Sequence, residues 1–174
     1  MNKYLSQNQK NWDERTKVHL TSDFYDVEGF RAGNSTLKSI EVSELGDVNG
    51  KSLLHLQCHF GLDTLSWARL GARVTGVDFS GEAIEAARKL ATETGIEARF
   101  IQSDVLKLDE LLDEQFDIVF TSYGVLAWIS DLKLWAEQIC KRLKPGGTFY
   151  IVEIHPFSYT LDDESTEKEL KINY

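Results

Sequence analysis

The stretch S-L-L-H-L-Q-C-H-F-G-L-D-T-L-S-W-A-R-L-G-A-R-V-T-G-V-D-F-S, residues 52–80, decides the fold of this chain. Its apolar start, 52–57, is typical of a strand that is buried on both faces. A tight loop, an amphipathic helix beginning near Leu62 and a second buried strand at 73–78 follow. This order is the βαβ unit that opens a nucleotide- or nucleoside-binding α/β sheet.

The loop after the first strand distinguishes between two classes of ligand. Asp78, at the tip of the second strand, is placed to accept hydrogen bonds from both hydroxyls of a ribose. A pyrophosphate needs a loop of small residues, so that the backbone can approach its oxygens. Here Gln57, His59 and Phe60 crowd the turn, and only Gly61 remains. The sequence therefore predicts an adenosine derivative without phosphates, with S-adenosylmethionine as the leading candidate.

Helix and strand alternate through the rest of the chain. We expect three further strands, at about 97–102, 116–121 and 147–154. The helices between them are expected to begin near Gly81, Val105 and Asp131, the last ending in L-K-P-G-G at 143–147. Right-handed crossovers then predict a doubly wound, Rossmann-like parallel sheet of order 3-2-1-4-5, with helices on both faces.

The composition limits the kinds of partner and compartment. The chain has 174 residues, enough for one domain, and a formal net charge of -9. This charge disfavours nucleic acid and anionic membranes, because both attract clustered Lys and Arg. No signal peptide and no apolar run of roughly 20 residues are found. Cys58 and Cys140 are not paired by any pattern, so we expect reduced thiols in a cytoplasmic protein.

We divide the chain into three segments by their patterns. Residues 1–34 are polar with scattered aromatics and are expected to form a cap or lid. Within them, Phe24 and Tyr25 either close over a ligand or pack in the core. Residues 35–155 form the ligand-binding domain, and residues 156–174 form an acidic tail without strand pattern.

Several later motifs strengthen the nucleoside interpretation. They are F-D-I-V-F-T-S-Y-G-V-L at 116–126, L-K-P-G-G-T-F-Y-I-V-E at 143–153 and S-D-V at 103–105. Together with 52–80 they resemble the class I S-adenosylmethionine-dependent methyltransferases, in particular the small-molecule, type 11-like group. The resemblance covers about residues 35–155. It implies S-adenosylmethionine as cofactor and a small-molecule methyl acceptor as partner.

The chain departs from this family in two regions. His55 stands where the family has an acid, and Gln57 and His59 replace the first two loop glycines. Gln57 could still offer its side-chain amide to the methionine carboxylate or ammonium. The family's final two strands are not found, so the chain looks C-terminally truncated. The fifth strand would then be an exposed edge through which copies of the chain could self-associate.

We expect the cofactor contacts to follow the carboxyl ends of the strands. The expected residues are Gln57, Cys58, His59, Gly61, Asp78, Phe79, Ser80, Ser103, Asp104, Val105, Ser122, Tyr123 and Trp128. Phe79 either stacks on adenine or belongs to the core. Asp104 could contact the adenine amino group, cap the following helix, or do both. Tyr123 and Trp128 either hold the sulfonium by cation–π attraction or pack ordinarily.

Tyr123 and His155 are the candidate catalytic residues. His155 is either a general base or a structural histidine in the turn before Pro156. A base is needed only if the acceptor must lose a proton. No metal is expected from His55, Cys58 and His59, because no second ligand pair follows and strand alternation should send His55 and Cys58 to opposite faces. Cys58 as a nucleophile is disfavoured.

Two other functions remain open at this point. A nicotinamide-dependent dehydrogenase would share the βαβ unit and the ribose acid, but the motif G-x-G-x-x-G is missing. A non-catalytic domain that binds S-adenosylmethionine, or serves interaction, would account for the altered loop.

Overall fold

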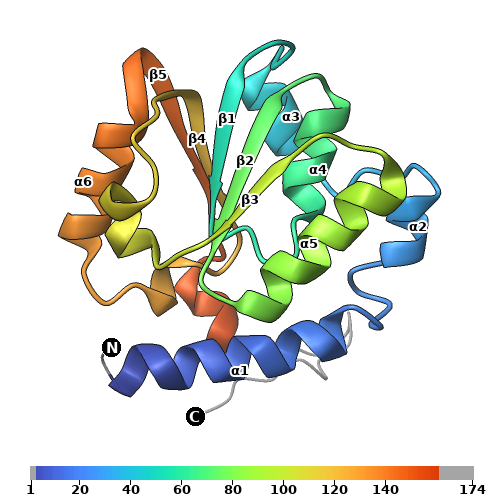
Figure 1. Ribbon diagram of the computed structural model, residues 1–174, viewed down its shortest axis with the longest axis horizontal. Helices are drawn as coiled ribbons and strands as arrows, with labels where there is room; N and C mark the ends of the chain where they lie inside the picture. The colour runs from blue at the N-terminus through green and yellow to red at the C-terminus, as the bar shows by residue number, and fades with distance from the viewer. Residues whose placement is uncertain (1–2, 161–174) are drawn as a thin grey trace.

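A computed structural model describes residues 3–160 (Figure 1). Five parallel strands form a single sheet of order β3-β2-β1-β4-β5, which confirms the predicted topology. The strands are β1 Ser52–Leu56, β2 Arg73–Asp78, β3 Arg99–Gln102, β4 Phe116–Ser122 and β5 Leu143–Val152. The strand order reverses between β1 and β4. Open α/β sheets bind ligands at the carboxyl ends of the strands beside such a reversal.

Helices cover both faces of the sheet, as predicted (Figure 1). The α-helices are α1 Lys3–His19, α2 Val27–Arg31, α3 Ser39–Leu45, α4 Leu62–Arg69, α5 Gly81–Thr94 and α6 Leu132–Arg142. Three 3₁₀ turns are η1 Val105–Glu110, η2 Leu126–Trp128 and η3 Pro156–Thr160. Helices α3, α4 and α5 lie on one face, and α6 and η1 lie on the other.

Strand alternation explains this two-sided core. In β1, Leu54 and Leu56 pack with Trp135 and Ile139 of α6. Leu53 points to the opposite face and packs in a second cluster around the α4 helix. Both faces of β1 are therefore buried, as the continuous apolar run predicted.

The structure corrects four predictions about elements and their bounds. The segment at Val105 is a 3₁₀ turn because Lys107 leaves helical geometry. Strand β3 begins at Arg99, two residues later than predicted. The stretch 143–147, expected only to end a helix, already belongs to β5: Leu143 pairs with Phe116, and the register then shifts so that Thr148 pairs with Ile118. This strand ends at Val152 rather than at 154.

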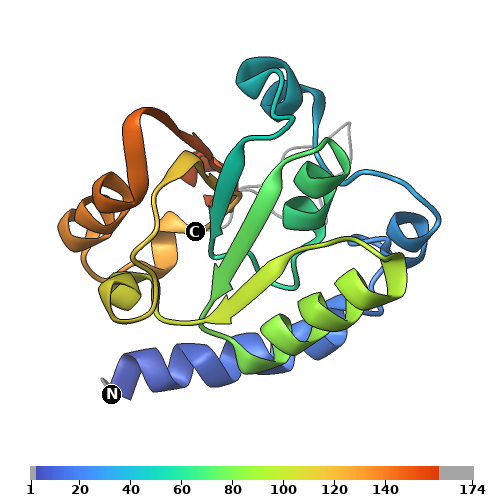
Figure 2. The same ribbon diagram turned by 45° about the horizontal axis from the view of Figure 1, so that its top comes forward.

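Helix α1 lies across the carboxyl end of the sheet, where the arrowheads of β2 and β3 point (Figures 1 and 2). The Gln9 amide donates to the carbonyl of Phe79 at 2.8 Å. Thr16 is its one fully buried side chain among those described. The helix is therefore held over the strand ends by hydrogen bonds and by aromatic contacts of Trp12.

Strand β5 forms an edge of the sheet and pairs only with β4 among the described residues. Phe149 and Ile151 on this strand are each 36% exposed. Most of the acidic tail, residues 161–174, lies outside the described residues, so self-association through β5 stays a prediction. Across residues 3–160, no helix has the length and apolar character needed to cross a membrane.

Candidate functional site

The carboxyl edge of the sheet gathers the residues expected from the sequence. Because all five strands are parallel, the segments that follow them lie at one edge. These segments contain Gln57 to Gly61 after β1, Asp78 to Ser80 after β2, Ser103 to Val105 after β3, Ser122 to Trp128 after β4, and His155 after β5.

The loop after β1 keeps a glycine-like backbone without glycines at two positions. Gln57 has a φ of 57° and His59 a φ of 49°, both in the left-handed region. This conformation costs a side-chain-bearing residue about 1–2 kcal/mol. Gly61 has a φ of 80°, and a Cβ there would lie 2.7 Å from the Phe100 ring. Three positions of the loop, 57, 59 and 61, therefore adopt left-handed backbone conformations that favour glycine.

Asp78 is buried at the end of β2, with 6% of its surface exposed. One carboxylate oxygen accepts the backbone N–H of His59 at 2.8 Å, and the other accepts that of Ser80 at 2.9 Å. Burial raises the pKa of Asp78 to about 6, although these backbone hydrogen bonds act in the opposite direction. The acid therefore ties the first loop to the second and keeps lone pairs for further donors.

The segment after β3 is a capped turn. The Asp104 carboxylate accepts the N–H of Leu106 at 3.0 Å, so its capping role is confirmed. The Ser103 hydroxyl donates to the Asp104 carbonyl at 3.1 Å, and Val105 is buried. The Ser103 N–H donates to the carbonyl of Asp78 at 2.9 Å, which places this turn beside the buried acid.

Helix α1 contacts the segment after β2 directly. The Ser80 hydroxyl caps α5 by accepting the N–H of Ala83 at 3.1 Å, and it donates to Asp13 of α1 at 2.5 Å. Phe79 is half-buried, and its carbonyl accepts the amide of Gln9. The cap segment thus reaches two of the residues that the sequence assigned to a ligand.

An aromatic cluster stands over the loop. It consists of Trp12, His19, Tyr25, His59 and Trp128, with ring centroids of Trp12 at 5.3 Å from His59 and 5.4 Å from Trp128. His19 Nδ1 and His59 Nε2 are 3.0 Å apart. Burial and the neighbouring His19 lower the pKa of His59 to about 3. Two aromatics of α1 therefore roof the site, a feature that the polar sequence of this helix did not reveal.

The side chain of Gln57 bonds residues of α6 and of the segment after β4. Its side-chain oxygen accepts the indole N–H of Trp135 at 3.3 Å, and its amide donates to the Val125 carbonyl at 3.5 Å. The side chain thus holds the loop against α6, and its expected contact with the methionine group stays a prediction.

A polar cluster between β1, β4 and α4 contains an acid that the sequence analysis missed. The carboxylate of Asp63, in the first turn of α4, accepts hydroxyl hydrogen bonds from Thr36 at 2.5 Å and Ser122 at 3.1 Å. His55 lies beneath it and bonds the Thr64 hydroxyl at 2.8 Å. Burial lowers the pKa of His55, so its ring is neutral at physiological pH. Acids are ordinary in a first helical turn, and this hid Asp63 in the sequence.

Tyr123 is held by α3 and the segment before it. Its backbone is left-handed, with a φ of 45°, and the ammonium of Lys38 lies 4.3 Å from the centre of its ring. Burial and the neighbouring Glu41 carboxyl raise the pKa of Tyr123. Glu41 is fully buried, and its Oε1 has no hydrogen-bond partner within 3.5 Å among the described residues, although Tyr123 is close enough to influence its pKa. A tyrosine that keeps its proton is poorly suited to act as a base.

His155 occupies the turn that its position before Pro156 suggested. Its Nδ1 accepts the N–H of Phe157 at 3.2 Å, and its carbonyl accepts the hydroxyl of Ser158 at 2.7 Å. The imidazole is exposed. The structural interpretation of His155 therefore has direct geometric support.

The predicted separation of His55 and Cys58 is wrong. Both lie against Thr64, because the left-handed turn at Gln57 interrupts the strand alternation. Burial raises the pKa of the Cys58 thiol well above its usual range, which disfavours a reactive thiolate. Within residues 3–160, no three His, Cys, Asp or Glu side chains gather so that they could hold a metal.

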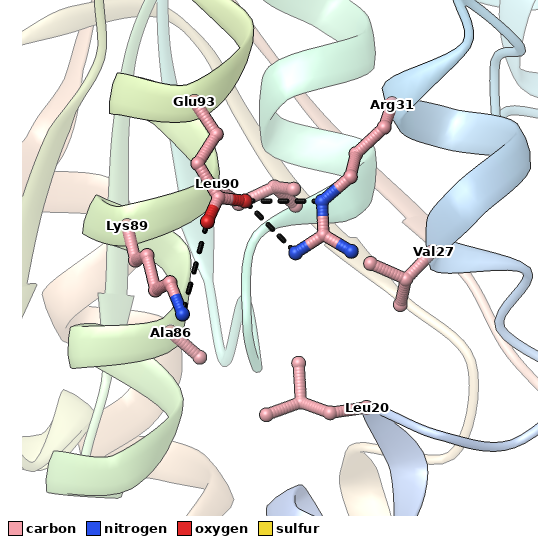
Figure 3. A pocket seen from close by; sticks show the side chains of 7 residues that line it. All are labelled: Leu20, Val27, Arg31, Ala86, Lys89, Leu90 and Glu93. Atoms are coloured by element: carbon pink, nitrogen blue, oxygen red, sulfur yellow. Dashed lines mark hydrogen bonds and ion pairs between the residues drawn. The ribbon is translucent and has the colours of Figure 1, made fainter.

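A separate small pocket lies between α2 and α5 (Figure 3). It has a volume of about 210 Å³ and an apolar wall that includes Leu20 and Val27. At its mouth Arg31 bonds Glu93 at 2.8 and 3.0 Å, and Lys89 lies 3.7 Å from the same carboxylate. The charged groups around this pocket pair with one another. The ion pair between Arg31 and Glu93 joins α2 to α5.

The sheet order, the loop after β1 and the acid after β2 define a doubly wound α/β protein of the Rossmann-like class. Residues 54–151, more than half of the chain, match the methyltransferase domain family, and the chain belongs to that family. It is 31% identical over 159 residues to the ubiquinone biosynthesis O-methyltransferase of Vibrio cholerae serotype O1, covering 88% of this chain and 64% of that enzyme. The chain thus spans just under two thirds of that relative's length.

Two solved structures are similar to this chain in fold. A protein from work on the conversion of a disulfide bond into a thioacetal group during echinomycin biosynthesis is 30% identical, with a TM-score of 0.62 over 70% of this chain and 52% of that one. The glycopeptide N-methyltransferase MtfA, in complex with S-adenosyl-L-methionine, is 24% identical, with a TM-score of 0.57 over 64% of this chain and 50% of that one. The second likeness concerns the fold alone.

Proposed function

We propose that this protein binds S-adenosylmethionine and transfers its methyl group to a small-molecule acceptor. The observation that carries the proposal is Asp78, a buried acid at the end of β2 that lies against the loop after β1. In a member of the methyltransferase domain family, this is where a ribose would be held.

The donor and acceptor groups of the site fit a nucleoside without phosphates. The Asp78 oxygens accept the backbone N–H groups of His59 and Ser80 and keep lone pairs, which suits two ribose hydroxyls. The segments 57–61, 78–80 and 103–105 contain no Lys or Arg that could neutralise phosphate. In addition, the buried Nδ1 of His59 has no hydrogen-bond partner among the described residues and could serve a ligand.

The remaining contacts follow from the order of the strands. The turn at Ser103 to Val105 lies on the β3 side of Asp78 and would receive the adenine, with Asp104 near its amino group. Phe79 would pack against the adenine ring. Residues after β1 and β4, on the other side of Asp78, would receive the methionine part.

When bound, the sulfonium supplies an activated methyl group. The protein's task is to align the acceptor with it and exclude water, and well-aligned partners can gain roughly 7–11 kcal/mol. Trp12, His59 and Trp128 of the aromatic cluster would exclude water and attract positive charge. The name of the Vibrio cholerae relative favours a hydroxyl group on the acceptor of this protein too.

Residues 1–34 would act as the lid of this site. The contacts of Gln9 and Asp13 with the segment after β2, and of His19 with His59, support this role. Tyr25 shares in it through its contacts with His59 and Phe60, whereas Phe24 is 87% exposed. The free thiols of Cys58 and Cys140 are compatible with a reducing compartment such as the cytoplasm.

Calorimetric titration tests the cofactor. We expect binding of S-adenosylmethionine and S-adenosylhomocysteine and none of NAD. Asp78→Asn should weaken binding by at least about ten-fold, since a hydrogen bond to a charged acceptor contributes about 1.5–3 kcal/mol. Asp113→Asn, which changes an exposed acid, is the matched control. Unchanged affinity in Asp78→Asn, or binding of NAD instead, would contradict the assignment.

Methyl transfer itself needs a second measurement. Transfer of a labelled methyl group to a panel of small hydroxyl, amine and thiol compounds is expected to identify an acceptor class. Tight cofactor binding with no transfer to any of them, also in a chain extended to the full length of its relatives, would favour the non-catalytic alternative.

A further inference from the structure

We infer that Asp63 binds the ammonium group at the amino-acid end of the cofactor, an inference that rests on the proposed function. Asp63 was not among the residues expected from the sequence. Its assignment comes from its place at the strand reversal, its hydrogen-bond partners and the absence of a counter-charge.

The orientation of the cofactor follows from the sheet order. With the ribose at Asp78 after β2 and the adenine on the β3 side, the amino-acid end must extend over β1 and β4. This is the point at which the strand order reverses. Asp63 stands there, since its carboxylate bonds Ser122 at the end of β4 and its helix begins directly after the β1 loop.

The side chain first expected at this end is engaged elsewhere. Gln57 bonds Trp135 and Val125, on the side of α6. His55 of β1 is neutral, and its ring bonds Thr64. A charged partner for an ammonium group must therefore come from another element, and α4 presents Asp63.

The surroundings of Asp63 hold its negative charge without cancelling it. Hydroxyls of Thr36 and Ser122 donate one to each carboxylate oxygen, and each oxygen has capacity for another donor. The N-terminal turn of α4 also favours an anion. Among the described side chains, no Lys or Arg forms an ion pair with Asp63, and the nearby Lys38 lies over the Tyr123 ring instead.

Two related ligands, one with the amino-acid end and one without it, test the role of Asp63 separately from the rest of the site. S-adenosylhomocysteine has the amino-acid end, and 5′-methylthioadenosine has the same nucleoside without it. By calorimetry, Asp63→Asn should weaken S-adenosylhomocysteine binding by at least about ten-fold and leave 5′-methylthioadenosine binding unchanged. Asp78→Asn should weaken both ligands, and Asp113→Asn neither. Retained 5′-methylthioadenosine binding also shows that the Asp63→Asn protein is folded.

The remaining outcomes are distinct. Equal binding of S-adenosylhomocysteine by wild type and Asp63→Asn would overturn the inference alone, and so would an equal loss of both ligands. Wild-type protein that binds neither ligand would overturn the proposed function and this inference with it. A measurement without any variant adds a further check: wild type should bind S-adenosylhomocysteine at least about ten-fold more tightly than its analogue lacking the amino group. Equal affinity for these two compounds would also overturn the inference.

Discussion

Gln57 holds a backbone conformation that suits glycine better than any other residue. A left-handed φ of 57° brings its Cβ close to the backbone, whereas glycine has no such contact. Its side chain contributes two long hydrogen bonds, to Trp135 and Val125. The strain and the side-chain contacts can be separated by comparing two truncated variants.

We expect Gln57→Gly to be more stable than Gln57→Ala by about 1 kcal/mol, because both lose the side chain and only alanine keeps the strain. Urea denaturation measures the free energies of unfolding. The same pair at Glu137, an exposed position in helix α6, should show the opposite order. If alanine were the more stable residue at both positions, the loop would not be strained.

Asp78 and His55 respond to pH in opposite directions. The pKa of Asp78 is raised to about 6 in the folded protein, so between pH of about 4 and 6 the folded state holds a proton that the unfolded state has lost. Its contribution therefore lowers stability as pH rises through that window, by up to about 3 kcal/mol. The pKa of His55 is lowered by burial, so its contribution lowers stability as pH falls below about 6.5.

Two variants should reveal these opposite dependences of the free energy of unfolding on pH. Relative to wild type, Asp78→Asn should lose more stability on acidification below pH of about 6, and His55→Gln should lose less below pH of about 6.5, while buried His59 acts alike in all of them. Free energies of unfolding measured across this range, with Asp113→Asn as the control, test both. Identical pH profiles in wild type and both variants would show that neither group is buried as described.

At the scale of elements, β5 is the one strand with a long open edge among those described. It runs from Leu143 to Val152, and its partly exposed Phe149 and Ile151 favour pairing with another strand. We expect the 174-residue chain to self-associate with rising concentration in sedimentation experiments. Ile151→Lys should reduce this association, because a charge on an edge strand opposes pairing.

Leu111→Lys is the matched control, since Leu111 is an exposed aliphatic residue away from this edge, after η1. It should leave association unchanged. A monomer at every concentration, with slow amide exchange along 147–152, would show that the edge is covered within the chain.

At the scale of the whole molecule, periodicity predicted most of the fold. The apolar runs of β1, β2 and β4 and the stripe of α6 reported burial directly, so these elements are found close to where the sequence placed them. The start of β5 was missed because Pro145 and Gly146 usually end regular structure, whereas here they sit in a strand whose register shifts. A local sequence pattern carries no information about how strands pair across the sheet.

The site was predictable only in part for a related reason. Residues that follow strand ends could be collected from the parallel topology alone. Asp63 and the roof formed by Trp12 and His19 could not, because their roles depend on contacts with distant segments. His59, for example, lies 40 positions from His19 along the chain. The sequence pattern also did not predict the direction of side chains at and after a residue with left-handed backbone, as Gln57 and Cys58 illustrate.

The position of α1 sets an order of assembly during synthesis. The helix leaves the ribosome before the sheet, yet Phe79, the partner of Gln9, follows 70 positions later, and Trp128 comes later still. At about 5–20 residues per second, α1 therefore waits for roughly 5–20 seconds before its docking surface exists. A polar helix of 17 residues is marginal by itself in water during that time. The helix that covers the binding edge is thus made before the sheet, but it can take its place only after Phe79 and Trp128 have been made.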